Sequence, residues 1–219
     1  QGFRVDSPGV EIIGFKIESN KSAGIYLTSN AEDTTIKDNL IFDVSNNPVE
    51  STNAIRVEKN SANIINNTIK KHQHGVLIAK NFETSEKVII QDNKFIKNGL
   101  DGVYIVGKQS ESSGHIIRRN VFNDTMGLYT DGSEIGAAIL LREVNADITG
   151  LKIHHNEFFN NSLHAIRAWD SEEDGFTEKV NATYNYWGDP SGPHHSVKNP
   201  DGEGDSVSDN VTFEPWLDS

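Results

Sequence analysis

Arginine and aromatic side chains recur in this sequence at matching positions of short apolar runs. Residues of the first set come directly after a small residue and an apolar residue. Residues of the second set come two positions after the first-set position of the same run. The two sets contain Arg4, Tyr26, Arg56, Tyr104, Arg142, Arg167 and Trp169. A guanidinium group can hold a carboxylate through two parallel hydrogen bonds, and an aromatic face can stack on a sugar ring. Brought onto one face, these side chains would bind an acidic glycan.

The same runs contain candidates for proton transfer. β-Elimination of a uronate requires a cation beside the carboxylate, a base for the C5 proton and an acid for the leaving oxygen. The side chains available for these roles are Arg56, Tyr104, His164 and Arg167. Hydrolysis requires paired carboxylates, and Asp101 and Asp170 flank the runs, but their spacing does not establish a pair. Because no acid–base motif is complete, the sequence favours binding over cleavage by a polysaccharide lyase, which stays the alternative.

A calcium site is predicted in the acidic segment after Trp169. Carboxylates alternate there at Asp170, Glu172 and Asp174, and glycine follows. Hard oxygen ligands in a loop suit Ca²⁺, and the spacing partly matches the start of an EF-hand loop. The full motif fails because Asn181 occupies the twelfth position, where glutamate is required. A solvated run of charge is the alternative, and it is also the alternative for a second acidic cluster at Asp201, Glu203, Asp205 and Asp209.

Composition excludes several classes of protein. The 219 residues carry a net charge of −12, without the basic footprint that a nucleic-acid binder needs. No segment approaches the ~20 apolar residues of a membrane-spanning helix. Cysteine is absent and methionine occurs once, so the ligands that soft metals prefer are nearly missing. The lack of disulfides is compatible with a secreted protein stabilised by repeats, and three histidine pairs have no carboxylate at motif spacing.

Two interlocked repeats predict where the candidate binding and proton-transfer side chains lie. In the first repeat an apolar residue precedes asparagine by three positions, and isoleucine or an aromatic residue follows two positions later. The asparagines are Asn39, Asn67, Asn93, Asn120, Asn156 and Asn185, at steps of 26 to 36 residues. The second repeat is a small residue followed by apolar, variable and apolar residues, as in Gly24-Ile25-Tyr26-Leu27. Such runs alternate with period two, which predicts short strands separated by turns.

Stacked coils are the fold that this periodicity predicts. A single repeat cannot bury its apolar side, whereas successive repeats bury a continuous core. Stacking at ~4.8 Å places like residues on like, so the asparagines should form a hydrogen-bonded ladder. A second inward column should contain Ile17, Ile41, Ile69, Phe95, Phe122, Phe158 and Trp187. The variable positions face outward, which brings the arginine and aromatic residues onto one strip of the first sheet.

These motifs resemble the pectin-lyase-like superfamily, in particular its members with short repeats of the NosD-like and surface-protein kind. The resemblance implies an all-β, right-handed parallel β-helix of about seven coils. Residues 1–187 would form the β-helix and residues 188–219 an irregular C-terminal cap of the same domain. The segment from Asn185 to Gly188 and the Pro215-Trp216-Leu217 tail resemble the end of such surface β-helices. Since this fold hosts enzymes, adhesins and spacers, the resemblance implies little about activity.

Function is predicted from the strip and the fold together. We expect an extracellular or cell-surface module that binds a polysaccharide or serves as surface architecture, without nucleic-acid binding or membrane insertion. The first coil begins at Gly2-Phe3-Arg4-Val5, which leaves an open sheet edge. Natural proteins avoid such edges, so either upstream coils or self-stacking should cover it, with a contact centred on residues 1–20.

Overall fold

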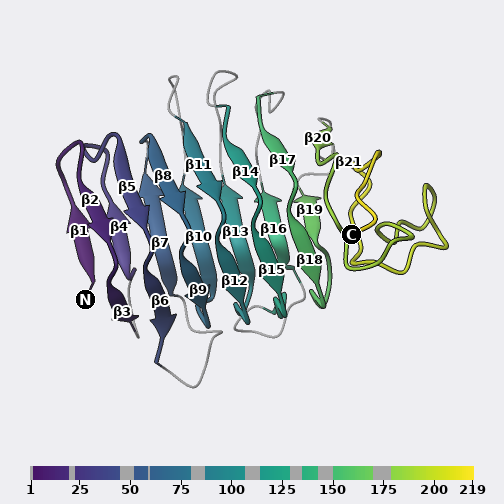
Figure 1. The fold of residues 1–219 in the computed structure, drawn as a ribbon, viewed down its shortest axis with the longest axis horizontal. Coiled ribbons are helices and arrows are strands. Elements are labelled where there is room, and N and C mark those ends of the chain that lie inside the picture. The colour runs from purple at the N-terminus through teal and green to yellow at the C-terminus, as the bar shows by residue number, and fades with distance from the viewer. Residues whose placement is uncertain are drawn as a thin grey trace.

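The computed structural model describes residues 2–19, 23–44, 52–58, 60–79, 87–106, 114–128, 135–142, 150–169 and 179–219. The described chain winds as a solenoid in which each coil contributes one strand to each of three parallel sheets (Figure 1). This arrangement confirms the predicted all-β parallel architecture and the coil count of about seven. Within the described ranges, no helix has the length and apolar character needed to cross a bilayer.

The first sheet contains seven strands and presents the predicted strip. Its strands, in spatial and chain order, are β1 (Phe3–Val5), β4 (Ile25–Leu27), β7 (Asn53–Glu58), β10 (His74–Ala79), β13 (Asp101–Val106), β16 (Ala137–Arg142) and β19 (Ile166–Trp169). All the neighbouring strands are parallel, and each pairs with the strand one coil further along the chain. Residues one coil apart in sequence are therefore neighbours in space.

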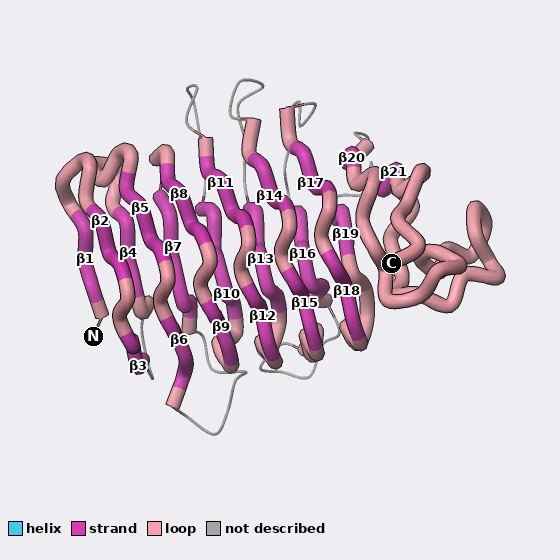
Figure 2. The backbone as a smooth tube through the Cα atoms, viewed as in Figure 1, coloured by secondary structure: helices cyan, strands magenta, loops and turns pink. Residues whose placement is uncertain are grey.

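The other two sheets contain six strands each. The second sheet consists of β2 (Glu11–Ile13), β5 (Thr34–Lys37), β8 (Ala62–Ile65), β11 (Val88–Gln91), β14 (Ile116–Arg118) and β17 (Lys152–His154). The third sheet consists of β3 (Lys16–Ser19), β6 (Leu40–Asp43), β9 (Thr68–Lys70), β12 (Lys94–Ile96), β15 (Val121–Asn123) and β18 (Glu157–Phe159). The C-terminal segment is mostly loop, and its short strands β20 (Val180–Asn181) and β21 (Val211–Thr212) pair in parallel (Figure 2).

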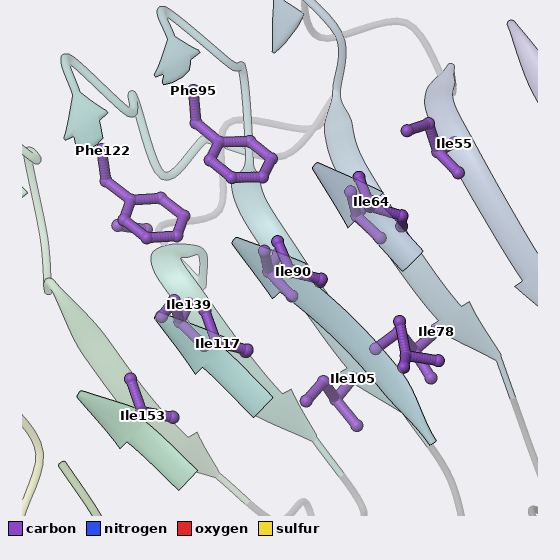
Figure 3. Packing of buried hydrophobic residues seen from close by; sticks show 14 of the residues in the cluster. Ile55, Ile64, Ile78, Ile90, Phe95, Ile105, Ile117, Phe122, Ile139 and Ile153 are labelled. Atoms are coloured by element: carbon purple, nitrogen blue, oxygen red, sulfur yellow. The ribbon is translucent and has the colours of Figure 1, made fainter. Parts of the chain in front are cut away.

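The core consists of inward columns in which like side chains stack from coil to coil (Figure 3). Phe95, Phe122, Phe158 and Trp187 are fully buried, and successive ring centroids lie 4.7, 5.1 and 5.1 Å apart. Burial of each such side chain contributes roughly 1.5–3 kcal/mol. The aromatic column also explains the small residues that open the first-sheet strands: a Cβ added at Gly102 would lie 2.6 Å from Phe122 Cδ1. Larger residues there would collide with the rings.

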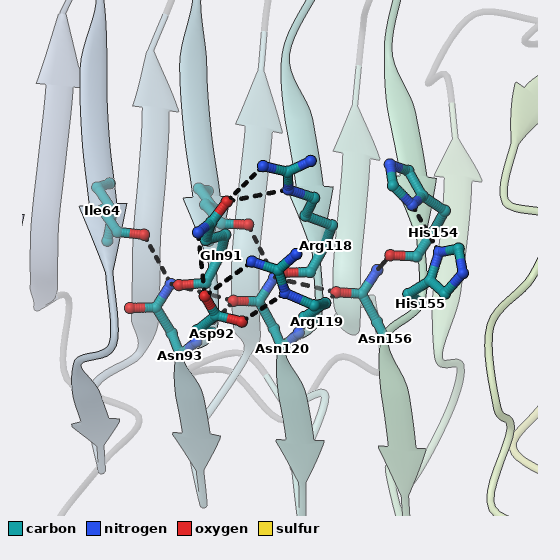
Figure 4. A network of polar contacts seen from close by, with 11 residues as sticks. Ile64, Gln91, Asp92, Asn93, Arg118, Arg119, Asn120, His154, His155 and Asn156 are labelled. Carbon is teal, nitrogen blue, oxygen red and sulfur yellow. Dashed lines mark hydrogen bonds and ion pairs between the residues drawn. The ribbon is translucent and has the colours of Figure 1, made fainter. Parts of the chain in front are cut away.

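The six repeated asparagines lie buried between the second and third sheets. In each of five successive steps, the side-chain Nδ2 donates to Oδ1 of the asparagine one coil further on, at 3.0 Å. Nδ2 also donates to a backbone carbonyl of the preceding coil, for example from Asn93 to Ile64 at 2.8 Å (Figure 4). The residue before each of these asparagines has a positive φ, between 53° and 59°. The tight corner thus combines left-handed backbone with amides that bond along the stack.

A second polar column lies at the other end of the third sheet, and the repeat analysis missed it. Its buried members are Ser19, Asp43, His72, Asn98, Thr125 and Asn161. The backbone N–H of His72 donates to Asn98 Oδ1 at 3.2 Å, and that of Thr125 donates to Asn161 Oδ1 at 3.1 Å. Burial lowers the pKa of His72 to about 4, against the opposing charge of Asp43. The column varies in residue type, so a search for one recurring residue does not detect it.

The first coil exposes apolar side chains. Phe3, Ile13 and Phe15 are more than one third exposed. The Phe3 and Phe15 rings meet edge to face, with their centroids 5.2 Å apart. Self-stacking or coverage by upstream coils at this edge stays a prediction.

Candidate functional site on the first sheet

Strand register brings the first set of predicted site residues into one outward row. The residues in register are Arg4, Tyr26, Arg56, Leu77, Tyr104, Leu140 and Arg167. A neighbouring row, two residues further along each strand, contains Glu58, Ala79, Val106, Arg142 and Trp169. Because adjacent parallel strands are ~4.8 Å apart, the members of each row are close neighbours along the sheet. Leu77, which is buried, separates Arg4, Tyr26 and Arg56 from the later polar members of the row.

The N-terminal cluster comprises Arg4, Tyr26, Arg56 and Glu58. The Tyr26 ring lies between two guanidinium groups, with Arg4 Cζ 5.2 Å and Arg56 Cζ 5.8 Å from its centroid. Arg56 donates through Nε and Nη2 to Glu58 Oε1, at 2.8 and 2.5 Å, and the Tyr26 hydroxyl donates to Glu58 Oε2 at 2.7 Å. These side chains, together with Phe3, line a cleft of about 350 Å³.

Glu58 contributes a negative charge to this cleft. Partial burial pushes the pKa of Glu58 upward, but the hydrogen bonds from Tyr26 and Arg56 outweigh it and hold the pKa below its ordinary value. The bond to Glu58 in turn raises the pKa of the Tyr26 hydroxyl. Glu58 is therefore an anion at neutral pH and Tyr26 is protonated. With Arg4 and Arg56, the cluster has two positive charges and one negative charge.

The C-terminal cluster comprises His74, Asp101, Tyr104 and Arg167. His74 Nδ1 lies 2.9 Å from Asp101 Oδ2, and the side chains are 12% and 0% exposed. Asp101 Oδ1 accepts the backbone N–H of Ala137 at 3.1 Å. The imidazole stacks on the Tyr104 ring, with the centroids 5.0 Å apart and the planes inclined by 22°. A buried carboxylate thus orients a nearly buried imidazole that lies flat against a tyrosine.

Burial dominates the electrostatics of the C-terminal cluster. It raises the pKa of Asp101, and the contacts with His74, Ala137 and Arg167 oppose that rise. It also lowers the pKa of the Arg167 guanidinium, against the opposing charge of Asp101. His164, a proton-transfer candidate, contacts the C-terminal segment: its Nδ1 lies 2.9 Å from Ser206 Oγ, and burial and then the charge of Arg167 lower its pKa. The structure therefore groups Arg167 with Asp101 and attaches His164 to the cap.

The predicted calcium ligands Asp170, Glu172 and Asp174 lie outside the described residues, and so does the side chain of Trp169. The acidic tail residues, which are described, are dispersed. Asp205 Oδ2 accepts hydrogen bonds from Asn161, whereas Asp209 lies 3.3 Å from His195 Nε2. Among the described residues, no three histidine or acidic side chains gather in a way that could hold a metal.

Sequence reasoning missed the two contacts that define the clusters. Arg56 was identified but its pairing with Glu58 was not, although both lie on one strand two positions apart. His74 belongs to one of the three histidine pairs that have no carboxylate at motif spacing, and its contact with Asp101 comes from a residue one coil away that this spacing does not reveal. The signal is the coil period: His74 and Asp101 are 27 residues apart, the same step that separates Asn93 from Asn120.

The comparisons with known proteins agree with this architecture. The family described as the right-handed beta helix region matches residues 2–86 and again residues 79–177. Together the two matches cover most of the chain, so the protein belongs to this family and is a right-handed parallel β-helix, consistent with the pectin-lyase-like superfamily. No curated protein and no solved structure gives a match to this chain.

Proposed function

We propose that this β-helix binds an acidic polysaccharide along the outward face of its first sheet, as a non-catalytic module outside the cell or at its surface. The observation that carries the proposal is the cleft in which Tyr26 lies between Arg4 and Arg56. Sugar rings stack on tyrosine, and guanidinium groups bind carboxylates. A uronate unit offers both features.

The surrounding face supports binding of a polymer. The solenoid repeats outward positions at a regular ~4.8 Å spacing over seven strands, so an extended chain lying along the stack can contact polar groups on either side of the buried Leu77. Tyr104, Arg142 and Arg167 continue the same two rows beyond Leu77. In a protein of net charge −12, a local group of arginines is a natural contact for an acidic ligand, because it attracts the anion that the net charge of the protein repels.

The test is calorimetric titration of the protein with oligosaccharides of uronic acid and with neutral oligosaccharides of equal length. We expect binding of the acidic oligomers alone, and Arg56→Gln should weaken it about tenfold or more, as the loss of a charge-assisted hydrogen bond predicts. Arg119→Gln is the matched control, because Arg119 also pairs with a carboxylate, Asp92, but on another face. Equal weakening by both variants, or equal binding of neutral oligomers, would refute the proposal.

A second candidate function is cleavage of the same polymer by β-elimination, and the contact between His74 and Asp101 favours it. In this reaction the outer nitrogen of His74 would take the C5 proton, and the C4–O bond would break as the C4–C5 double bond forms. Tyr104 would protonate the leaving oxygen, while Arg167 neutralises the substrate carboxylate. Unsaturated products absorb in the ultraviolet. Their release by the wild type and not by His74→Gln would establish cleavage, and no release from a panel of uronic polymers would leave binding alone.

A further inference from the structure

A second group of basic side chains lies on the outward face of the second sheet, away from the first-sheet clusters. Strand register aligns Gln91, Arg118 and His154 (Figure 4). It also aligns Ile116 with Lys152. His155 follows at the corner, with a left-handed φ of 56°. We call Arg118, Lys152, His154 and His155 the second-sheet cluster.

The cluster concentrates positive charge in a protein of net charge −12. Arg119, at the same corner, is neutralised by Asp92, whose oxygens accept its Nε and Nη2 at 2.7 and 3.0 Å. Arg118 is held differently, because its Nε and Nη2 donate to the neutral amide oxygen of Gln91, at 2.9 and 2.8 Å. The amide orients the guanidinium without forming an ion pair, although the charge of Asp92 also acts on Arg118. Lys152 lies exposed beside it.

The two imidazoles add ring nitrogens that can each bind a proton. His154 Nδ1 and His155 Nδ1 lie 2.8 Å apart, so one nitrogen donates to the lone pair of the other. Protonation of both Nδ1 atoms turns both into donors. The pair then requires an acceptor between or beside the rings.

The surroundings of His154 favour an anion over a metal ion. Burial lowers the pKa of His154 most, and the positive charges that act on it lower the pKa further: those of His155, Arg118, Lys152 and Arg119. All four charged groups that act on this ring are basic. A divalent cation would meet the same repulsion, whereas an oxyanion would relieve it and would offer acceptor oxygens to the guanidinium and imidazole N–H groups.

We propose that the second-sheet cluster is an oxyanion-binding site that takes a sulfate or phosphate ester group of a glycan partner, and that its affinity rises as the pH falls. The oxyanion accepts hydrogen bonds from Arg118 and His154, while Lys152 and His155 add charge. Binding favours the protonated imidazoles, so it takes up protons, and by linkage acid strengthens it. The site is independent of the first-sheet face, and variants can separate the two.

The experiment is a titration of the protein followed through the histidine ring resonances and by calorimetry. The probes are a sulfated disaccharide, its desulfated counterpart and inorganic sulfate, each at neutral and at mildly acidic pH. We expect the sulfated disaccharide to bind more tightly in acid and to raise the titration midpoint of His154, while the desulfated sugar does neither. Inorganic sulfate that acted equally well would support the site and assign it to the free ion.

Arg118→Gln and His154→Gln should each weaken binding about tenfold or more. Lys37→Gln is the matched control, because it removes a positive charge from the same outward row three coils from Arg118, and it should retain the wild-type affinity. Acidic oligosaccharide binding at Arg56 should persist in both cluster variants. The proposal is overturned if Lys37→Gln weakens binding as much as Arg118→Gln, or if Zn²⁺ but no sulfated probe shifts the His154 resonances.

Discussion

The two polar clusters of the first sheet have opposite relations to solvent. In the N-terminal cluster the ion pair is open to water, with Arg56 39% and Glu58 31% exposed, and it lines a cleft. In the C-terminal cluster the carboxylate of Asp101 is wholly buried beneath His74. The same sheet, with the same strand spacing, therefore contains a solvent-exposed ion pair that lines a cleft and a buried carboxylate that contacts an imidazole.

Equivalent positions of a solenoid can therefore have different local environments. Arg56 and Leu77 are register partners, yet one lines a cleft and the other is buried. The two clusters also differ in where the carboxylate partner lies. Glu58 lies on the same strand as Arg56, whereas Asp101 lies one coil beyond His74. The Arg56–Glu58 contact stays open to solvent, whereas Asp101 is buried and also accepts the backbone N–H of Ala137 from the next coil.

Removal of each carboxylate should give the largest contrast. Asp101→Ala leaves the backbone N–H of Ala137 and the imidazole of His74 without their acceptor in a buried place, so we expect a loss of roughly 2–4 kcal/mol in unfolding free energy. Glu58→Ala breaks a solvent-exposed pair and should cost about 1 kcal/mol or less. Urea unfolding monitored by tryptophan fluorescence measures both. Similar losses from the two variants would remove the distinction between the clusters.

The pH dependence of stability should differ in sign between the clusters. The pKa of Glu58 is depressed below 4.5 in the folded state, so its contribution is complete above that value and is lost as the pH falls through the folded pKa. The pKa of Asp101 is raised above 3.8, so stability falls as the pH rises from there through the folded pKa. Glu58→Gln should remove an increase of stability with rising pH, and Asp101→Asn should remove a decrease of stability with rising pH.

Urea unfolding of the wild type and the two variants at successive pH values from about 3 to 6 tests these signs. The difference between each variant and the wild type is the informative quantity. Burial lowers the pKa of His72 and His115 to about 4, and these residues contribute to all three proteins alike. Difference curves of the same sign for both variants would show that the two carboxylates experience similar surroundings.

Much of this molecule follows from its sequence because the solenoid converts spacing into position. The recurring Asn93 and Phe95 pattern predicts both the coil step and the inward columns, and strand alternation predicts that Arg4, Tyr26 and Arg56 share a row. Cross-coil partners were harder to predict. A contact such as that of His74 with Asp101 occurs once, so no repetition separates it from chance.

The second polar column could not be predicted because its residue type varies from coil to coil. His72 and Asn98 occupy one polar column, in which Asn98 accepts a backbone N–H whereas neither ring nitrogen of His72 has a hydrogen-bond partner among the described residues. The predicted calcium segment has no counterpart in other coils, so periodicity contains no information about its conformation. Sequence periodicity therefore predicts the scaffold well, and individual contacts only where they recur.

Ligand affinity should also separate the clusters, with a smaller effect. Glu58 competes with an acidic ligand for Arg56, so Glu58→Gln should tighten binding of uronic oligosaccharides about three- to tenfold, or roughly 1 kcal/mol. The glutamine retains an oxygen for the Tyr26 hydroxyl. Asp101→Asn should leave affinity unchanged if the N-terminal cluster alone binds the carboxylate. Calorimetry on the two variants decides, and tighter binding by Asp101→Asn alone would move the binding site to the C-terminal cluster.

The smallest expected effect is that of Tyr26→Phe. The substitution removes the hydrogen bond from the hydroxyl to Glu58, and we expect a loss of about 0.5–1 kcal/mol in stability because water can replace the donor at this half-open position. The ring stays between Arg4 and Arg56, so affinity for the acidic oligosaccharide should remain within about twofold of the wild type, whereas Tyr26→Ala removes the stacking face and should weaken it further. If Tyr26→Phe weakens binding as much as Tyr26→Ala does, the hydroxyl and not the ring face contacts the sugar. The N-terminal cluster would then recognise its ligand through polar contacts.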